Sequence, residues 1–324
     1  NSPQVEGNNQ FVDGLIGVLT SVRNIQINYT QNSGTVLPGY IPSIGFLGSS
    51  RPSLGFIFGS QDDVRYEAAK NGWLTSYPDF NQNFTQVTNK IFKATANIDL
   101  LPDLKVDLTL DRSYAENFSE QYDVSDGHYN ARSPYSSGIF SISTVMIKSA
   151  FWASDENGSV AFNEFRSNRL TIANRLATQR GIDISNPANL DAEGYPLGYG
   201  KNNQAVLLPA FLSAYSGGVA VLGSKGSNDA SNVSLGIFRN FPIPNWNVKY
   251  NGLMRFDFFK KNFKRFSMQH NYRASYTINA FRSNFEYDKA PNGLDASGNF
   301  FNKTIMSNVN LVEQFNPLLR MDFE

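Results

Sequence analysis

The stretch Arg265–Ala280, RFSMQHNYRASYTINA, decides the fold class. Its odd-numbered positions are all polar, and its even-numbered positions are all apolar except His270. Strict alternation places polar and apolar side chains on opposite faces of a β-strand. The run covers roughly 16 residues, whereas a globular strand usually has about 5–6 and a tilted strand crosses a membrane with about 9–11. The stretch therefore predicts a strand of the length found in membrane barrels.

A hairpin upstream follows the same rule. Apolar and polar residues alternate over Phe92–Leu100 and again over Leu104–Asp111. Between them, Leu101-Pro102-Asp103 predicts a tight turn, because proline fixes φ at a value that turns require. Weaker alternation predicts further strands, giving about nine in all. These weaker strands are expected at 24–29, 140–148, 231–239, 245–258 and from Val309 into a last hairpin that turns at Asn316-Pro317.

The composition is typical of β proteins with one polar and one apolar face rather than of helical enzymes. Aromatic residues make up 14% of the 324 residues, with 26 Phe and 15 Tyr, and only 17% are charged. The 28 basic and 28 acidic side chains cancel, which argues against a nucleic-acid partner. The lack of cysteine excludes disulfides, thiolate metal sites and Cys nucleophiles.

Membrane helices and targeting segments are not expected. No apolar run is long enough for a membrane-spanning helix, and residues 1–4, NSPQ, do not open a signal peptide. The sequence stops at Met321–Glu324, inside a predicted strand. We therefore expect the chain to be a piece of something longer.

Two longer segments interrupt the strands. Residues 34–60 are rich in Gly, Pro and Ser and are too long for a bare turn. Residues 149–230 are expected to be a small helical insertion, whose helix ends at Gly181. One face of that helix is apolar, formed by Phe162, Phe165, Ile172, Ala173 and Leu176. The opposite face is basic and is expected to be solvated rather than to bind a partner; it carries Arg166, Arg169, Arg175 and Arg180.

The sequence offers no candidate catalytic, cofactor-binding or metal-ligating residue, so we expect neither enzyme activity nor a cofactor. The Gly-rich stretch Gly194–Lys201 lacks the spacing and the hydroxyl of a phosphate-binding loop. His128 is expected in a solvated loop, with a weak metal site beside Asp123 and Asp126 as the alternative. His270 is expected to be structural, and two unrelated histidines make no catalytic triad.

Acidic pairs and aromatic residues near strand ends are two further groups that could carry a function. Asp62-Asp63 and the pair Glu116 and Glu120 are expected at exposed positions, without the shifted pKa of a catalytic carboxylate. Aromatic residues near strand ends either pack a sandwich core or form the interfacial rings of a membrane barrel. For strands this long we favour the rings, whose members would be Trp246, Phe258, Phe259, Phe263, Phe266 and Phe281.

Several long and idiosyncratic stretches resemble the SprA family of giant outer-membrane translocons, which serve type IX secretion and gliding motility. The resemblance runs nearly end to end over this chain. Its stretches are Asn24–Thr30, Leu37–Tyr40, Phe165–Leu170, Gly198–Lys201, Val206–Leu212, Phe266–Tyr287 (FSMQHNYRASYTINAFRSNFEY) and Val309–Phe323 (VNLVEQFNPLLRMDF).

The resemblance implies an all-β fold, a segment of a very large transmembrane antiparallel β-barrel with a small helical insertion. Residues 1–148 would be barrel strands with a long Gly/Pro-rich external segment, 149–230 the insertion, and 231–324 further barrel strands. The implied function is passage of folded proteins through the outer membrane of a Gram-negative bacterium to the cell surface. The implied partners are secreted cargo, a small outer-membrane barrel at a lateral opening, a periplasmic plug protein and outer-membrane lipids.

Two other classes of protein remain open at this stage: a different outer-membrane barrel, such as a nutrient receptor or a porin, and a soluble β-rich adhesin or enzyme. For a barrel, short turns face the periplasm and long loops face outside. Residues 101–103, 259–262 and 316–318 would then be periplasmic, and 31–88, 120–137 and 282–303 external. Counting crossings places 149–230 in the periplasm, with 231–239 as the returning strand.

Overall fold

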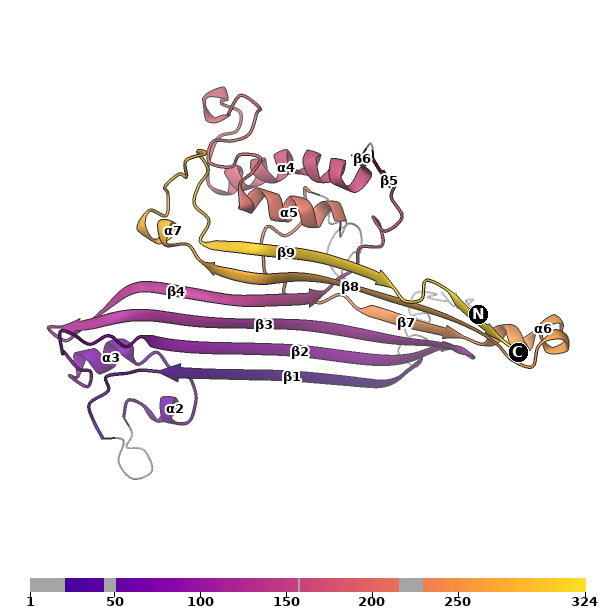
Figure 1. Ribbon diagram of the computed structural model, residues 1–324, viewed down its shortest axis with the longest axis horizontal. Helices are drawn as coiled ribbons and strands as arrows, with labels where there is room; N and C mark the ends of the chain where they lie inside the picture. The colour runs from indigo at the N-terminus through magenta and orange to yellow at the C-terminus, as the bar shows by residue number, and fades with distance from the viewer. Residues whose placement is uncertain (1–20, 44–50, 157, 216–229) are drawn as a thin grey trace, which may run out of the picture.

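The structure is a computed structural model that describes residues 21–43, 51–156, 158–215 and 230–324. One eight-stranded antiparallel sheet dominates it (Figure 1), in the order β1-β2-β3-β4-β8-β10, with β7 beside β3 and β8 and β9 beside β8. The strands of this sheet are β1 (Val22–Val36), β2 (Phe84–Leu101), β3 (Leu104–Ser125), β4 (His128–Ser143), β7 (Asn245–Tyr250), β8 (Phe266–Ser283), β9 (Thr304–Phe315) and β10 (Arg320–Phe323). The expected antiparallel β-sheet is thus confirmed.

The longest strands far exceed those of globular sheets. β3 has 22 residues, and β2 and β8 have 18 each. At about 3.3 Å per residue, β3 is roughly 70 Å long. We call the half of the sheet near the β2–β3 turn, Leu101–Leu104, the proximal half, and the other the distal half.

Strands β4 and β7 share one position in the sheet. On one side, β4 pairs with the distal part of β3 and β7 pairs with Leu104–Thr109. On the other side, β4 pairs with the distal part of β8 and β7 pairs with Met268–Tyr272. Residues 144–244 are therefore inserted within a single strand position; we call them the insertion.

Strands β9 and β10 share a position in the same way. β9 pairs with β8 from Tyr272 onward, and β10 continues along β8 from Gln269 to Phe266. Residues 316–319 are thus a break in one strand, held where Asn271 exchanges backbone hydrogen bonds with Asn316 and Pro317. Asn316 and Pro317 form a turn as predicted, but the predicted hairpin is wrong, because β9 and β10 both run antiparallel to β8 and the chain keeps its direction.

Two further predictions made from alternation fail. Residues 231–239 form turns and bends, and the strand predicted over 245–258 stops at Tyr250, followed by the 3₁₀ turn η2 (Gly252–Arg255) and α6 (Asp257–Asn262). Because the insertion interrupts one strand and adds no crossing, the count that placed 149–230 in the periplasm does not hold.

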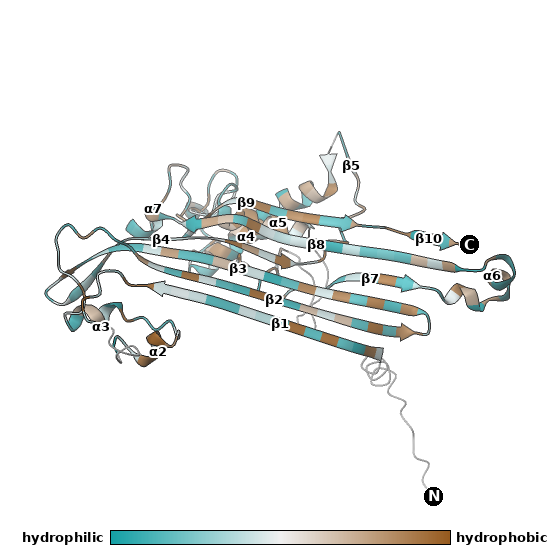
Figure 2. Cartoon of the chain, turned by 60° about the horizontal axis from the view of Figure 1, so that its bottom comes forward, coloured by the Kyte–Doolittle hydropathy of each residue, from teal (hydrophilic) through white to brown (hydrophobic). Residues whose placement is uncertain are grey.

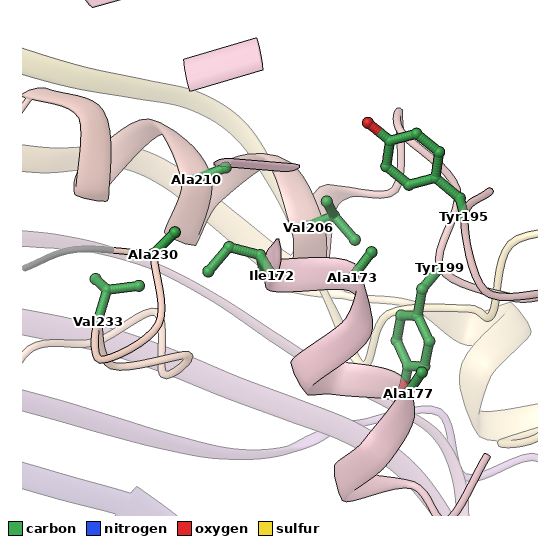
Figure 3. Packing of buried hydrophobic residues seen from close by; sticks show 9 residues of the cluster. All are labelled: Ile172, Ala173, Ala177, Tyr195, Tyr199, Val206, Ala210, Ala230 and Val233. Atoms are coloured by element: carbon green, nitrogen blue, oxygen red, sulfur yellow. The ribbon is translucent and has the colours of Figure 1, made fainter. Parts of the chain in front are cut away.

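The insertion packs its own small core. It contains β5 (Ser154–Asp155), β6 (Gly158–Ser159), α4 (Val160–Gln179), η1 (Pro187–Asn189) and α5 (Gln204–Tyr215). The buried cluster drawn in Figure 3 joins α4, α5 and the segment after residue 230, with Ile172, Val206 and Val233 almost fully buried. Helix α4 ends before Gly181, whose φ of 81° suits glycine.

Helix α5 was missed by the sequence analysis. Its segment, QAVLLPAFLSAY, is apolar nearly all round and carries Pro209 inside the helix, so no amphipathic period marks it. The basic face of α4 is only partly solvated: Arg166 and Arg180 are exposed as expected, whereas Arg169 and Arg175 are half-buried and donate to backbone carbonyls. Arg175 donates to the Ala230 carbonyl at 2.7 Å, and Arg180 donates to Asn292 and lies over the Phe300 ring.

The distal end is closed by the segment between β1 and β2, which carries α2 (Leu54–Ile57) and α3 (Arg65–Lys70). Another short helix, α7 (Phe285–Lys289), lies in the β8–β9 loop. Arg65, the first residue of α3, pairs with Glu120 of β3. The Glu120 carboxylate is only 3% exposed and also accepts a hydrogen bond from Tyr129. Arg65 also holds the pKa of the Asp63 carboxyl below its usual value by hydrogen bonding. The expectation that Glu120 is exposed is therefore wrong.

We predict that Arg65→Met loosens α3 from the sheet. The substitution leaves the Glu120 carboxylate buried without its cation, a loss that costs about 3–5 kcal/mol in comparable pairs. Hydrogen exchange of the α3 amides should speed up accordingly. Lys70→Met, an exposed change on the same helix, is the matched control and should leave exchange nearly unchanged. Equal exchange in both variants would contradict the role given to this ion pair.

Candidate functional surface

The two faces of the sheet are set by cross-strand pairing, because residues opposite each other in antiparallel strands share a face. In the proximal half, face A carries apolar rows that run across the strands. One row is Ile25, Ala96, Leu108, Trp246 and Tyr272, and the next is Ile98, Val106, Val248 and His270. Face B carries the polar residues between them.

In the part of the chain that the structure describes, Ala94 is the one buried member of the face A apolar rows on β1, β2 and β3, and the other members are exposed or half-buried. Ile25, Ile27 and Tyr29 are 59–65% exposed, and the inward partners Leu108 and Leu110 remain half-buried. In Figure 2, brown and teal alternate along these strands most strongly toward the end that carries α6. We call this surface the apolar band; its members are Ile25, Ile27, Tyr29, Phe92, Ala94, Ala96, Ile98, Leu104, Val106, Leu108, Leu110, Trp246, Val248 and Tyr250.

The opposite surface, face B in the proximal half, is a hydrogen-bonded polar ladder. Asp107 of β3 accepts from Asn97 of β2 at 2.7 Å and from Asn247 of β7 at 3.1 Å. Asn247 in turn accepts from Gln269 of β8 at 3.3 Å. Charged residues continue the ladder toward the turn, where Asp99 lies opposite Lys105 and Lys105 opposite Lys249. Such a surface is suited to contact with water.

The apolar band has a defined height. On β2 its members run from Phe92 to Ile98, and the alternation continues to Leu100, so that it covers about half of that 18-residue strand, close to the roughly 9–11 residues that cross a membrane core. Toward the distal half, the first charged residues on face A are Lys90 of β2 and Arg112 of β3. Lys90 lies opposite Tyr114, and Arg112 lies opposite Phe92. Arg112 donates to the Arg239 carbonyl of the insertion at 3.0 Å.

In the distal half, face A is covered or polar. Leu212 of α5 packs against Phe140 and Ile142 of β4 and Tyr276 and Ile278 of β8, which are nearly fully buried. Over β1 and β2, by contrast, face A carries Gln31, Ser33, Gln86, Thr88 and Lys90. On face A, the uncovered apolar surface is thus confined to the proximal half.

The aromatic residues singled out in the sequence separate into two groups. Phe259 contacts Phe258, Phe263 and Phe266 at ring distances of 5.0–5.9 Å, at the proximal end of the sheet. Phe323 of β10 joins them. Phe281, however, is 4% exposed and packs in the core between β3, β8 and the insertion, so its assignment to a surface ring is wrong.

The residues weighed for chemistry are not brought together. His128 bonds the Asp126 carbonyl at the distal end, whereas His270 bonds the Leu318 carbonyl at 2.5 Å in the proximal half. In the Gly194–Lys201 loop, Lys201 pairs with Glu193 at the surface. Among the described residues, His, Asp and Glu form no cluster suited to a metal ion.

Comparisons with known proteins add no name. No family model matches this chain, and neither does any curated protein. Within the described residues, every helix is too short or too polar to span a membrane. The two faces of the sheet are therefore the features of this chain that point to a function.

We predict that Leu108→Arg and Thr109→Arg, one residue apart, have opposite outcomes. Leu108 lies in the apolar band, and an Arg facing lipid near the bilayer midplane costs roughly 2–4 kcal/mol. Thr109 lies on face B opposite Thr95 and Asn245, where water solvates the new charge. If the apolar band faces lipid, the amount of folded protein in the membrane fraction should fall for Leu108→Arg and stay near wild type for Thr109→Arg.

A soluble sandwich would also suffer from Leu108→Arg, so a second measurement separates the two cases. A photoreactive lipid should label a probe at position 108 and spare one at position 109. Labelling at neither position would show that the apolar band packs against protein, and the membrane hypothesis would fall.

Proposed function

We propose that this chain forms part of the wall of an outer-membrane protein-conducting channel, with the apolar band toward lipid and face B toward an aqueous lumen. Secreted proteins pass through that lumen to the cell surface. The observation that carries the proposal is the pairing of an uncovered apolar band of membrane height with a continuous polar ladder on the other face. A barrel wall has this construction.

The unpaired edges of the sheet support a larger assembly. Within the described residues, β1 pairs only with β2, and β9 and β10 pair only with β8. Backbone groups left unpaired in lipid cost several kcal/mol each, so in a membrane both edges require neighbouring strands. Further strands on either side, closing a wide barrel, would supply them.

The resemblance to the SprA family favours a translocon of type IX secretion over a porin or nutrient receptor. On this proposal the protein resides in the outer membrane of a Gram-negative bacterium, serves gliding motility as well as secretion, and carries no enzyme activity. Its partners are secreted cargo, a small outer-membrane barrel at a lateral opening, a periplasmic plug protein and outer-membrane lipids. A porin or nutrient receptor is the second candidate, because either would have the same two faces.

Orientation is tested with single cysteines, since the chain has none of its own. Ala296, in the β8–β9 loop, and Lys260, on α6, are both exposed and lie at opposite ends of the sheet. We predict that a membrane-impermeant maleimide added to intact cells labels Ala296→Cys and not Lys260→Cys, because long loops face outside. After the outer membrane is permeabilised, both should react. The reverse pattern on intact cells would invert the orientation.

Protein passage is tested with photocrosslinking residues at two neighbouring positions of β2. Thr95 lies on face B, and Ala96 lies on face A. We predict that position 95 crosslinks to secreted proteins in transit and that position 96 does not, because only face B lines the lumen. Cells in which secretion is stalled give the longest-lived contacts. Absence of any cargo crosslink from position 95, with lipid contact retained at position 96, would favour the porin or receptor.

A further inference from the structure

The insertion leaves and rejoins the sheet at the distal edge of the apolar band. At its start, the Ser143 hydroxyl accepts a hydrogen bond from the Asp111 amide of β3 at 3.1 Å. At its end, Asn245 lies opposite Thr109 of β3. Both junctions thus lie beside Leu110, the last apolar residue of the band on β3. The insertion is anchored at one level of the wall, which is the band's boundary.

The insertion lies on the same face of the sheet as the band. Val145 and Met146, which open it, pack with Tyr272 and Ala274 of β8, and the Met146 amide donates to the Tyr272 hydroxyl at 2.7 Å. Tyr272 belongs to the face A row that includes Leu108 and Trp246. The insertion therefore stands on the side of the wall that carries the band, and not on the polar side.

Near this boundary the insertion exposes apolar side chains that its own core does not use. Phe151 is 69% exposed, Phe162 50% and Val160 48%, and none of them belongs to the buried cluster of α4 and α5. The helix face predicted from sequence included Phe162, so its exposure is a departure from that prediction. These three residues lie in the loop before α4 and in its first turn.

Of the three exposed residues, Phe151 contacts face A beside the band. The ring of Phe151 lies 5.5 Å from that of Phe315 of β9, and Phe315 is the cross-strand partner of Tyr272. In the same loop, the Lys148 ammonium lies 5.1 Å from the centroid of the Trp152 ring. Aromatic rings with a nearby cation are typical of the level where hydrocarbon meets lipid headgroups.

We propose that the insertion rests on the membrane surface outside the channel, with Phe151, Val160 and Phe162 inserted at the headgroup level of the leaflet that borders the distal half. This inference rests on the proposed function, since it requires the band to face lipid. The ligand is the lipid surface itself, held by the apolar side chains and not by charge, because Glu164 pairs with Lys148 and Asp155 and Glu156 lie nearby in the chain. The insertion would thus fix the height of the wall in the bilayer.

The experiment measures the depth of single sites in the full-length protein in lipid nanodiscs. Phe151→Cys, Val160→Cys and Phe162→Cys each receive a small fluorophore, and quenching is compared between lipids with a nitroxide near the headgroup and lipids with one deep in the acyl chain. Leu108→Cys reports the band. Leu197→Cys is the matched control, because Leu197 is 50% exposed in the insertion but lies in the loop beyond the C-terminal end of α4.

The headgroup nitroxide should quench positions 151, 160 and 162 several-fold more strongly than position 197, and the deep nitroxide should quench position 108 most strongly. Quenching at 151, 160 and 162 no greater than at 197, with 108 still quenched by the deep nitroxide, would overturn this inference and leave the proposed function standing. Position 108 unquenched by either lipid would overturn both. Three probe sites guard against a local effect of any one substitution.

Discussion

The structure depends on the cross-strand rows that join five strands in the proximal half, such as Ile25, Ala96, Leu108, Trp246 and Tyr272. Each antiparallel pair puts opposite residues on one face, so the period of each strand becomes a property of the whole sheet. A slip of one residue in the pairing between β3 and β7 would place Asp107 or Asn247 among the apolar rows. The hydrogen bonds of Asp107 with Asn97 and Asn247 reinforce the same register from the other face.

The two halves of the sheet differ in what covers face A. In the proximal half the apolar side chains have no protein cover within the described residues, and the polar ladder on the opposite face satisfies its own side chains. In the distal half the same strands continue, but their face A is buried under α5 or under the segment that carries α3, or is polar over β1 and β2. The Arg65–Glu120 pair, with Tyr129, lies in that covered region. The long strands thus pass through two different environments: a proximal half without protein cover on face A and a distal half that packs against other segments of the chain.

The insertion links the two halves. It occupies one strand position between β4 and β7, and Arg112 binds its returning backbone where the apolar band ends. A hundred-residue excursion of this kind is tolerated because the strand resumes in register, with Asn245 opposite Thr109 and Asn247 opposite Asp107. The polar ladder therefore crosses the interruption without a break.

The sequence by itself determined the proximal parts of β2 and β3, nearly all of β8, the faces of these segments, the turn at Pro102 and the helix that ends at Gly181, because alternation, turn chemistry and capping are local. Only the tertiary structure decided that β4 and β7 form one strand position, that 316–319 is a break rather than a hairpin, and that Glu120 and Phe281 are buried. The physical reason is that these features depend on which distant strand a segment pairs with. Asn245 and Thr109 are joined across more than a hundred residues, and no local period records that pairing.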